Sequence, residues 1–343
     1  MIKKVRFITL IVFVLFSVAL LAGCGSGGTS GTEATQGTEA TGGTEAAAEK
    51  ISGDFIMATG GTSGTYYPLG GAMCQILKTA TGANINANAT GASVENVRLL
   101  ERGEADLAIV QTDIMSYAVS GINNFEQEVK GVKSIGSLYP EVVHVVVGAD
   151  SGINSIEDLK GKKVSVGAAG SGTEINAQQF FEAYNMTYKD IDPRYLSFAE
   201  SATAFQDGTI DAFFCVAGTP NAAIVELKVS RDVKLVSLDQ EHQDALIAKY
   251  PFFAAHTVSK DVYDMAEDGQ TLAIKALLIV REDMTEQEVY LLTKGLYDNL
   301  DELGEAHAKG KEIALEKAME GVVPGNLHPG AAKYFQEKGI ATP

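Results

Sequence analysis

Few residues of this sequence could perform acid–base, nucleophilic or metal chemistry, and none stands in a pattern typical of an enzyme site. A G-x-S-x-G nucleophile motif is absent, because Ser63 has Gly61 two places before it but Thr65 two places after it. No H-E-x-x-H occurs and the histidines show no ligand spacing, so we expect no metal site. The histidines are His144, His242, His256, His307 and His328.

The remaining reactive residues have simpler structural interpretations. Asp106 and Asp211 begin apolar strands, where a capping role is expected, and Arg98 sits one turn into a helix, on a solvated face. Cys74 and Cys215 lie in apolar surroundings, and two cysteines make no disulfide framework in a chain of 343 residues. We therefore expect two buried free thiols. Cys215 ends a strand before a polar loop, and it alone keeps an enzyme alternative open.

Binding chemistry is better represented than catalysis, beginning with MATGGTSGTYYPLGGAM at residues 57–73. Glycines 60, 61 and 64 allow the backbone to turn tightly and to approach a ligand. Thr62, Ser63 and Thr65 can cap the following helix or donate hydrogen bonds to an anion at its positive end. The alternative is a tight turn with a good helix cap.

A second loop of the same kind is GAAGSGTEIN at residues 167–176, with Ser171, Gly172 and Thr173 before a helix. Its spacing approaches that of a phosphate-binding P-loop, but Thr173 stands where the lysine should be, so nucleoside triphosphate chemistry is excluded. One such loop alone would indicate a capped turn. Two of them, each starting a helix, favour a ligand-binding role.

Other strand-end loops add polar groups and apolar walls to the expected cleft. The cleft would thus be lined by neutral donors and aromatic rings, as in a binding site with few orienting polar groups. The additional polar candidates are Ser93, Asn96, Gln111, Asp113, Gly218 and Thr219, and the additional apolar candidates are Tyr66, Tyr67, Tyr139 and Phe214.

Strand and helix patterns alternate after residue 50, which predicts an α/β fold. A valine-rich extended stretch at 132–148 separates two series of β–α units, and the chain after an apolar run at 271–280 is largely helical. The predicted strands are 54–59, 84–90, 106–111, 163–167, 195–198, 210–216 and 233–238. The predicted helices are 66–79, 94–101, 155–159, 173–184, 199–206 and 220–227.

The two series also share a weak internal repeat. Residues 101–113 (ERGEADLAIVQTD) and 206–220 (QDGTIDAFFCVAGTP) both run from a glycine through an aspartate into an apolar strand and then a polar loop. Ligands of open α/β sheets bind at such carboxyl strand ends. The sequence therefore predicts two lobes whose polar loops face each other.

The N-terminus predicts export. Lys3, Lys4 and Arg6 precede an apolar run from 7 to 22 that is too short for a membrane span but suits a secretory signal. The run ends in Leu-Ala-Gly-Cys, so we expect a lipoprotein signal peptide at 1–23 and lipidation of Cys24. Residues 24–50, rich in Gly, Thr, Ala and Glu, form a low-complexity tether.

The mature chain is strongly acidic. Removing residues 1–23 takes away three positive charges and no negative ones, so the formal charge of −17 becomes −20. This charge argues against nucleic acid or an anionic membrane surface as partner. The membrane is expected to contact the protein only through its lipid.

Several segments together resemble a known family of receptors. They appear in order over residues 54–340: TGGTSGTYYPLGGAM, GASVENVRLLERGEADLAIVQTD, SLYPEVVHVVV, DLKGKKVSVGAAGSGTEINA, DGTIDAFFCVAGTPNAAI and LHPGAAKYF. In these segments the chain resembles TAXI-type solute receptors, the extracytoplasmic subunits of TRAP transporters. The resemblance implies a type II periplasmic-binding fold with two α/β lobes, a ligand cleft between them and two chain crossovers. It also implies delivery of a solute to a membrane permease driven by a sodium or proton gradient, without ATP hydrolysis at the receptor; we expect no cofactor and no catalysis.

Domain bounds follow from the same resemblance. Lobe I would comprise 51–146 and 256–343, lobe II would comprise 147–255, and the crossovers would lie near 142–148 and 251–257. The ligand loops would be 60–67, 91–96, 111–113, 170–173 and 215–220.

The resemblance also implies a ligand similar to glutamate, glutamine or 2-oxoglutarate. No arginine stands ready for its carboxylate, so helix N-termini would have to bind it. The expected location is the outer face of a bacterial cytoplasmic membrane. The alternatives are a binding protein of an ATP-driven importer or sensor, and an enzyme on the same fold.

Overall fold

The computed structural model describes residues 50–343. The expected signal peptide, the lipidated Cys24 and almost the whole tether lie outside the described residues. Within residues 50–343, none of the helices combines the length and the apolar character needed to span a membrane.

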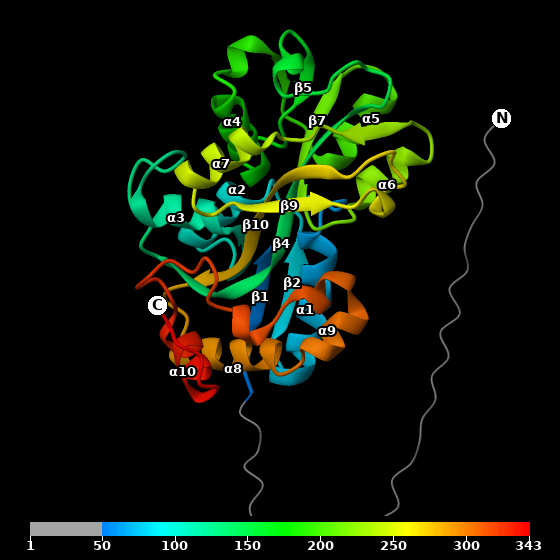
Figure 1. The fold of residues 1–343 in the computed structure, drawn as a ribbon. Helices are drawn as coiled ribbons and strands as arrows, with labels where there is room; N and C mark the ends of the chain where they lie inside the picture. Colours follow the sequence, from blue (N-terminus) through cyan, green and yellow to red (C-terminus); the bar gives the residue numbers. More distant parts are fainter. Residues whose placement is uncertain (1–49) are drawn as a thin grey trace, which may run out of the picture. The chain divides into compact units, whose positions relative to one another are not determined.

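Ten strands of the described chain form one sheet (Figure 1). They are β1 (Asp54–Ala58), β2 (Asn84–Asn88), β3 (Leu107–Gln111), β4 (Val132–Gly148), β5 (Lys163–Ser165), β6 (Asp192–Arg194), β7 (Ala212–Ala217), β8 (Val233–Leu235), β9 (Ala254–Val258) and β10 (Gly269–Arg281). Their order is β2-β1-β3-β10-β4-β7-β5-β6, with β8 beside β4 and β9 beside β10. The fold is therefore mixed α/β, as the sequence predicts.

The helices cover both faces of this sheet. They are α1 (Tyr66–Thr81), α2 (Ser93–Glu101), α3 (Thr112–Ser120), α4 (Gly172–Ala183), α5 (Phe198–Gln206), α6 (Ala222–Lys228), α7 (Gln240–Lys249), α8 (Glu286–Tyr297), α9 (Leu300–Ala306) and α10 (Pro329–Glu337). Short 3-10 turns occur at Glu157–Leu159, Tyr188–Asp190, Lys260–Val262, Ala308–Glu312 and Leu315–Lys317.

Two lobes are defined by the parallel parts of the sheet. In the first lobe β1 pairs in parallel with β2 and β3, and in the second lobe β5 pairs in parallel with β6 and β7. The long strands β4 and β10 pair antiparallel with each other and run through both lobes (Figure 1). The two lobes are thus joined by strands rather than by flexible loops.

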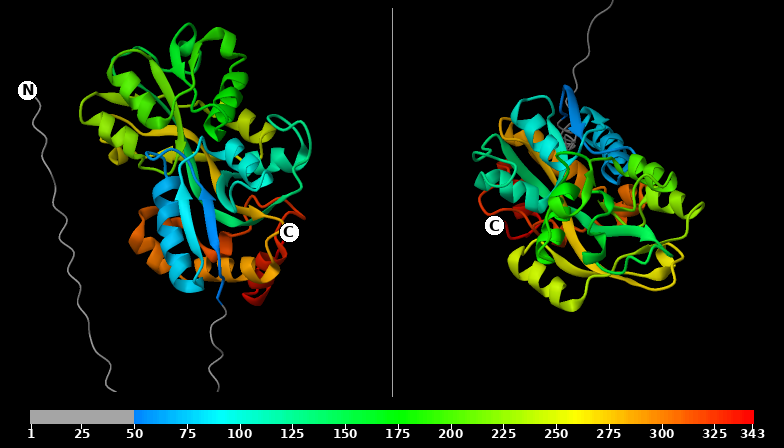
Figure 2. Two further views of the ribbon diagram at one scale, coloured as in Figure 1. Left: turned by 180° about the vertical axis from the view of Figure 1, so that it is seen from behind. Right: turned by 90° about the horizontal axis from the view of Figure 1, so that it is seen from above.

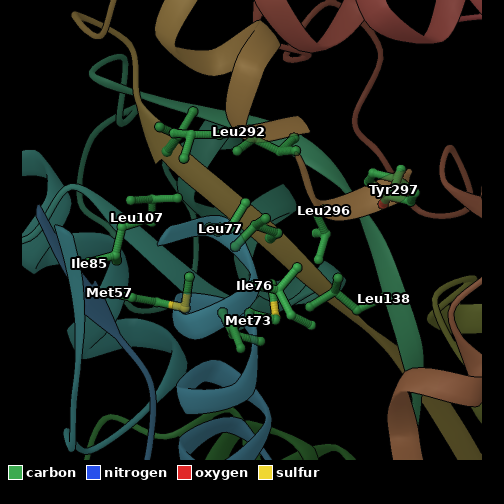
Figure 3. Packing of buried hydrophobic residues seen from close by; sticks show 14 of the residues in the cluster. Met57, Met73, Ile76, Leu77, Ile85, Leu107, Leu138, Leu292, Leu296 and Tyr297 are labelled. Carbon is green, nitrogen blue, oxygen red and sulfur yellow. The ribbon is translucent and has the colours of Figure 1, made fainter. Parts of the chain in front are cut away.

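The first lobe has a core on each face of its sheet. Helix α1 buries Leu69, Met73, Ile76 and Leu77, the helical spacing of an apolar face. Figure 3 shows Leu77 of α1 packed between strand residues and Leu292 and Leu296 of α8. The helices of the C-terminal part therefore lie in the same lobe as residues near 80, which Figure 2 also shows. On the other face α2 and α3 cover β1, β3 and β10.

The second lobe is built in the same way. Successive residues of β7 point to opposite faces, and each is fully buried: Phe214 packs with Phe180 and Phe181 of α4, and Phe213 with Phe205 of α5. A strand covered on both faces reads as a continuous apolar run, which explains the sequence AFFCVA. Helices α4 and α7 thus cover one face, and α5 and α6 the other.

The strand predicted at 195–198 is wrong. Ser197 instead begins a helix, because its Oγ accepts a hydrogen bond from the Glu200 N–H and the Glu200 carboxylate accepts one from the Ser197 N–H. This reciprocal capping box starts α5 at Phe198. The strand lies earlier, in β6. Helices α3 and α7 and strand β9 were not predicted.

Several structural expectations for single residues are met. The carboxylates of Asp106 and Asp211 each accept a backbone N–H of the neighbouring parallel strand at 2.8 Å, from Ile56 and Lys163 respectively. This shared contact gives the sequence repeat its physical basis. Cys74 and Cys215 are buried free thiols.

The packing also suggests where the chain changes lobe. Residues near 142 end the pairing of β4 with β10 and begin its pairing with β7. Val258 and Tyr263 pack in the same cluster as Phe213 of the second lobe, whereas Ala276 belongs to the first-lobe core. We therefore propose a return passage inside β10, later than the range expected from the sequence.

Candidate ligand-binding site

A cavity lies at the carboxyl ends of the parallel strands, where loops of the two lobes meet. It encloses about 540 Å³ of space not filled by atoms, a figure that includes its opening to solvent. The residues that line it are Gly60, Gly61, Gly64, Thr65, Tyr66, Thr90, Gly91, Ala92, Ser93, Gln111, Glu141, Ala168, Ser171, Gly172, Thr173, Ser197, Phe198 and Val216.

The loop between β1 and α1 supplies one wall and reaches across to the second lobe. The Gly64 N–H donates to the Gly61 carbonyl at 2.9 Å, which closes a tight turn. Thr65 makes no side-chain cap to α1. Its Oγ accepts the Gly218 N–H at 3.1 Å instead, so this hydroxyl bridges the lobes.

The N-terminus of α4 supplies the opposite wall. The Ser171 Oγ accepts the Glu174 N–H, and the Glu174 carboxylate accepts the Gly170 N–H at 2.8 Å, so the helix start is fixed. The N–H groups of the first turn have no carbonyl partner within their own helix. At Gly172 an added Cβ would lie 1.6 Å from Gln111 Oε1, so only glycine allows this close approach of the two lobes.

Backbone contacts add to the bridges between lobes. The N–H of Val94, in the first turn of α2, donates to the Gly170 carbonyl at 3.1 Å. The Asn221 side-chain amide donates to the Ser63 carbonyl at 3.1 Å. The lobes are therefore held together around the cavity by polar contacts.

A buried network of amides continues this interface. The Gln111 Nε2 donates to Asn176 Oδ1 at 3.1 Å, and Asn176 Nδ2 donates to Asp113 Oδ2 at 2.9 Å and to Gln179 Oε1 at 3.0 Å. Gln179 Nε2 in turn donates to the Tyr117 hydroxyl at 2.8 Å. The orientation of each side-chain amide therefore determines that of the next, because every amide oxygen must face an N–H or O–H donor.

Asp113 belongs to this network and does not line the cavity. It is fully buried, and burial raises its pKa to about 7 although the Ile114 N–H and the Asn176 amide donate to it. Its carboxylate is thus positioned to orient Asn176. The sequence suggested a direct contact with the ligand, whereas the structure gives Asp113 a bridging position.

Asn96 likewise lies behind the cavity wall. Its Nδ2 donates to the carbonyls of Thr59 and Ile109, at 2.6 and 2.8 Å, and its Oδ1 accepts the Thr90 hydroxyl. Beside it Ala92 adopts φ +77° and ψ −144°, a conformation that L-residues rarely adopt. Such strained backbone is found at functional sites, where surrounding contacts hold it in place.

Glu141 is the residue that sequence reasoning missed. It lies on β4 within the apolar segment SLYPEVVHVVV, is 2% exposed, and lines the cavity. The Tyr66 hydroxyl donates to its carboxylate at 2.6 Å. Burial raises the pKa of Glu141 to about 8. A carboxylate in the middle of a largely apolar strand was the available signal, because such a charge is costly when buried without a function.

Several other candidates lie outside the cavity lining. Phe214 is in the core of the second lobe, and Thr219 contacts His144 Nε2 at 3.2 Å. Burial lowers the pKa of His144 to about 4, so this imidazole is neutral. Tyr139 is fully buried near Glu141. Burial raises the pKa of its phenol, and the charge of the Glu141 carboxylate raises it further.

The sequence candidates thus divide into two groups. Those that line the cavity are Gly61, Thr65, Tyr66, Ser93, Gln111, Ser171, Gly172 and Thr173. Those that lie outside its lining are Thr62, Ser63, Tyr67, Asn96, Asp113, Tyr139, Phe214, Gly218 and Thr219. The lining also includes Glu141, Ser197 and Phe198, which lie in none of the loops that the sequence indicated.

The cavity lining contains few ionisable side chains. Of the residues that the structure describes, Glu141 is the one acidic side chain in the lining, and no lysine, arginine or histidine lines it. Among residues 50–343, His, Cys, Asp and Glu form no group of three that could hold a metal ion.

Comparisons with known proteins give a family and a set of similar structures. Residues 57–339 match the model of the NMT1-like family. The structure is similar to the periplasmic aliphatic sulphonate binding protein SsuA from Escherichia coli, with 14% identity, 84% of both chains covered and a TM-score of 0.46. A binding protein component of an ABC phosphonate transporter from Pseudomonas aeruginosa shows 11% identity, coverage of 76% and 79%, and a TM-score of 0.49. A putative L-cystine ABC transporter protein from Listeria monocytogenes shows 13% identity, coverage of 79% and 99%, and a TM-score of 0.46.

Proposed function

Because this chain belongs to the NMT1-like family, we propose that it is an extracytoplasmic solute-binding receptor that captures a small polar or carboxylate solute by cleft closure. The observation that carries the proposal is the cavity itself, which takes its walls from both lobes. A ligand enclosed in this way contacts two bodies at once, so its binding favours the closed arrangement.

The polar bridges around the cavity support closure as the working motion. Thr65 to Gly218 and Val94 to Gly170 are contacts between lobes that opening would expose to water. A hydrogen bond exchanged for one with water changes stability by only about 0.5–1.5 kcal/mol. Opening and closing therefore cost little, as a receptor that must release its solute requires.

The proposed solute class includes glutamate, glutamine and 2-oxoglutarate. The first turn of α4 with Ser171, Gly172 and Thr173 offers N–H and hydroxyl donors to one carboxylate, at the positive end of a helix. This arrangement replaces the arginine that the cavity lacks.

The proposed partner is the membrane permease of a TRAP transporter, and the receptor would be anchored to the outer face of the membrane through a lipid on Cys24. In this proposal residues 1–23 are a signal peptide, residues 24–50 are a tether, and the rest of the chain is the two-lobed binding body. Solute uptake by cells that lack the permease gene tests this pairing. Uptake that persists in these cells, or that is lost when an ATPase subunit is deleted instead, would refute it.

A thermal-shift screen of the purified protein tests solute binding directly. The panel comprises amino acids, 2-oxo acids, dicarboxylates and sugars, and a ligand at 100 times its Kd should stabilise the protein by about 2.7 kcal/mol. Mass spectrometry of the small molecules released on denaturation detects a solute that co-purifies with the protein. A protein that neither binds nor releases any solute would refute the receptor function.

A further inference from the structure

A lysine of the first lobe is buried against a glycine of the second lobe, outside the cavity. Lys309 lies in the 3-10 turn Ala308–Glu312 and is only 7% exposed. The turn belongs to the first lobe, because Leu303 before it and Ile313 after it pack in the first-lobe core. Lysine is rarely buried to this extent unless it is paired. Its position at a contact between the lobes therefore needs an explanation.

The contact with Gly218 is made by the aliphatic part of the lysine side chain. A Cβ atom added to Gly218 would lie 2.8 Å from Cε, 3.0 Å from Cδ and 3.1 Å from Cγ of Lys309. A larger residue at position 218 would therefore displace the lysine. The Gly218 N–H also donates to the Thr65 hydroxyl at 3.1 Å, so the first lobe contacts this one residue twice.

The ammonium group has one anionic partner among the described residues. Lys309 Nζ lies 2.5 Å from Glu312 Oε1, and the Glu312 side chain is 40% exposed. Two neighbouring imidazoles, His256 and His307, have lowered pKa values, because of burial first and the Lys309 charge second. Both imidazoles are therefore neutral at neutral pH. The buried ammonium group is thus balanced by a carboxylate that is itself partly exposed.

Closing the lobes must remove this ammonium group from water. Gly218 covers part of the lysine side chain when the lobes are in contact, and its departure on opening would let water reach the charge. The transfer of an ion from water into a protein interior is costly, and one partly exposed partner offsets only part of that cost. Packing of the aliphatic chain has the opposite effect, because it buries apolar surface. Lys309 therefore opposes closure through its charge and favours closure through its chain.

Building on the proposed receptor function, we propose that Lys309 is a positioning residue whose buried charge, shared with Glu312, keeps the lobes of the empty receptor apart until a solute is bound. Neither residue is part of the cavity lining, so the pair acts on the arrangement of the lobes and not on recognition. Only an open cavity admits a solute, and a solute that contacts both lobes supplies the free energy that closure requires.

Distances between two spin labels, measured by pulsed electron paramagnetic resonance, report the arrangement of the lobes in the solute-free protein. The identity of the solute is not needed. Gln75→Cys in the first lobe and Asp207→Cys in the second lobe place the labels at exposed positions. The native thiols of Cys74 and Cys215 are buried and should stay unlabelled.

Lys309→Met keeps a chain of similar length and removes the charge. Replacing a buried ion by an apolar residue of similar volume is often favourable, so the ratio of closed to open molecules should rise at least about fivefold. Lys311→Met, which changes an exposed lysine of the same turn, should leave the ratio unchanged. A distance distribution that is the same in Lys309→Met and wild type, or that moves toward the open arrangement, would overturn the proposal.

Removing the partner of the lysine tests the charge from the other side. Glu312→Gln leaves the ammonium group without its anion, so closed molecules should become several-fold rarer, whereas the exposed control Glu316→Gln should have no effect. The double variant Lys309→Met/Glu312→Gln should close as readily as Lys309→Met alone. A merely structural ion pair would lower the Tm of these variants without moving the distances, and that result would refute the role of the pair.

The failure of this inference can be told from the failure of the receptor function. Solute binding combined with equal distances in Lys309→Met and wild type refutes the role of Lys309 and leaves the receptor intact. A shift of the distances in a protein that neither binds nor releases a solute supports the effect of the pair on the lobes and refutes the receptor.

Discussion

Replacing Glu141 with glutamine is expected to stabilise the ligand-free protein at alkaline pH, although it removes a group of the candidate site. The fully buried carboxylate has a pKa of about 8, against 4.5 for an ordinary glutamate. The folded state therefore holds a proton between pH 4.5 and 8 that the unfolded chain has lost. Stability must fall as pH rises through this range, because the folded state binds more protons than the unfolded one.

The magnitude follows from the same two pKa values. Each pH unit between them costs about 1.4 kcal/mol, so raising the pH from 5 to 8 costs the wild-type protein at most about 4 kcal/mol, and about 2 kcal/mol if structural relaxation and water halve the penalty. Glutamine keeps an oxygen for the Tyr66 hydroxyl but cannot ionise. Its advantage over glutamate should therefore grow by about 2–4 kcal/mol between pH 5 and pH 9.

Melting curves of the ligand-free protein at pH 5 and pH 9 measure this difference. At about 2–4 °C per kcal/mol, the Tm of Glu141→Gln relative to wild type should rise by at least about 4 °C from the lower to the higher pH. Glu126→Gln, which changes an exposed glutamate, should show no such trend. A Tm difference independent of pH would mean that Glu141 is not raised in pKa by burial, and the reasoning about its missing counter-charge would be wrong.

Four further predictions concern other parts of the molecule. Thr65→Ala should weaken solute affinity several-fold by removing a bridge between lobes, with the exposed Thr62→Ala as matched control in calorimetry; equal effects would refute the bridge. Gly172→Ala should abolish tight binding while lowering the Tm little, because the added methyl group collides only when the lobes are closed. Cys215→Ser should leave affinity within about threefold but cost about 1–3 kcal/mol of stability in chemical denaturation; loss of a turnover activity would instead favour an enzyme. Cys24→Ala should release the protein from the membrane fraction, and continued retention would refute the lipid anchor.

The sequence predicted the parts of the molecule that local patterns control. The α/β alternation, the glycine loop before α1 and the capped start of α4 were all found where the residues indicated. The strand expected at 195–198 was wrong because the aromatic residues there favour a strand, whereas the capping box of Ser197 and Glu200 starts a helix and decided the outcome. Local patterns compete at such positions, and a single hydrogen-bonded cap selects between them.

The cavity could be predicted only in part, since it depends on contacts between distant residues. Ser63 and Asp113 are residue types that often bind ligands. In the structure, however, the Ser63 carbonyl and the Asp113 carboxylate each accept a hydrogen bond from the second lobe. Glu141 was hidden for the opposite reason, as its neighbours in sequence form a core strand. Its hydroxyl partner, Tyr66, comes from helix α1, which only the folded chain brings beside β4.

The polar bridges between the lobes have a consequence for the time that a solute stays bound. If the closed arrangement is populated in only a fraction of empty molecules, the apparent affinity is reduced by that fraction. Asn221, which donates to the Ser63 carbonyl, is outside the cavity lining but contributes to this balance. A substitution at such a bridge should therefore change how long the solute stays bound without changing which solute is recognised. The rate of solute release and the choice of solute would then be set by separate residues.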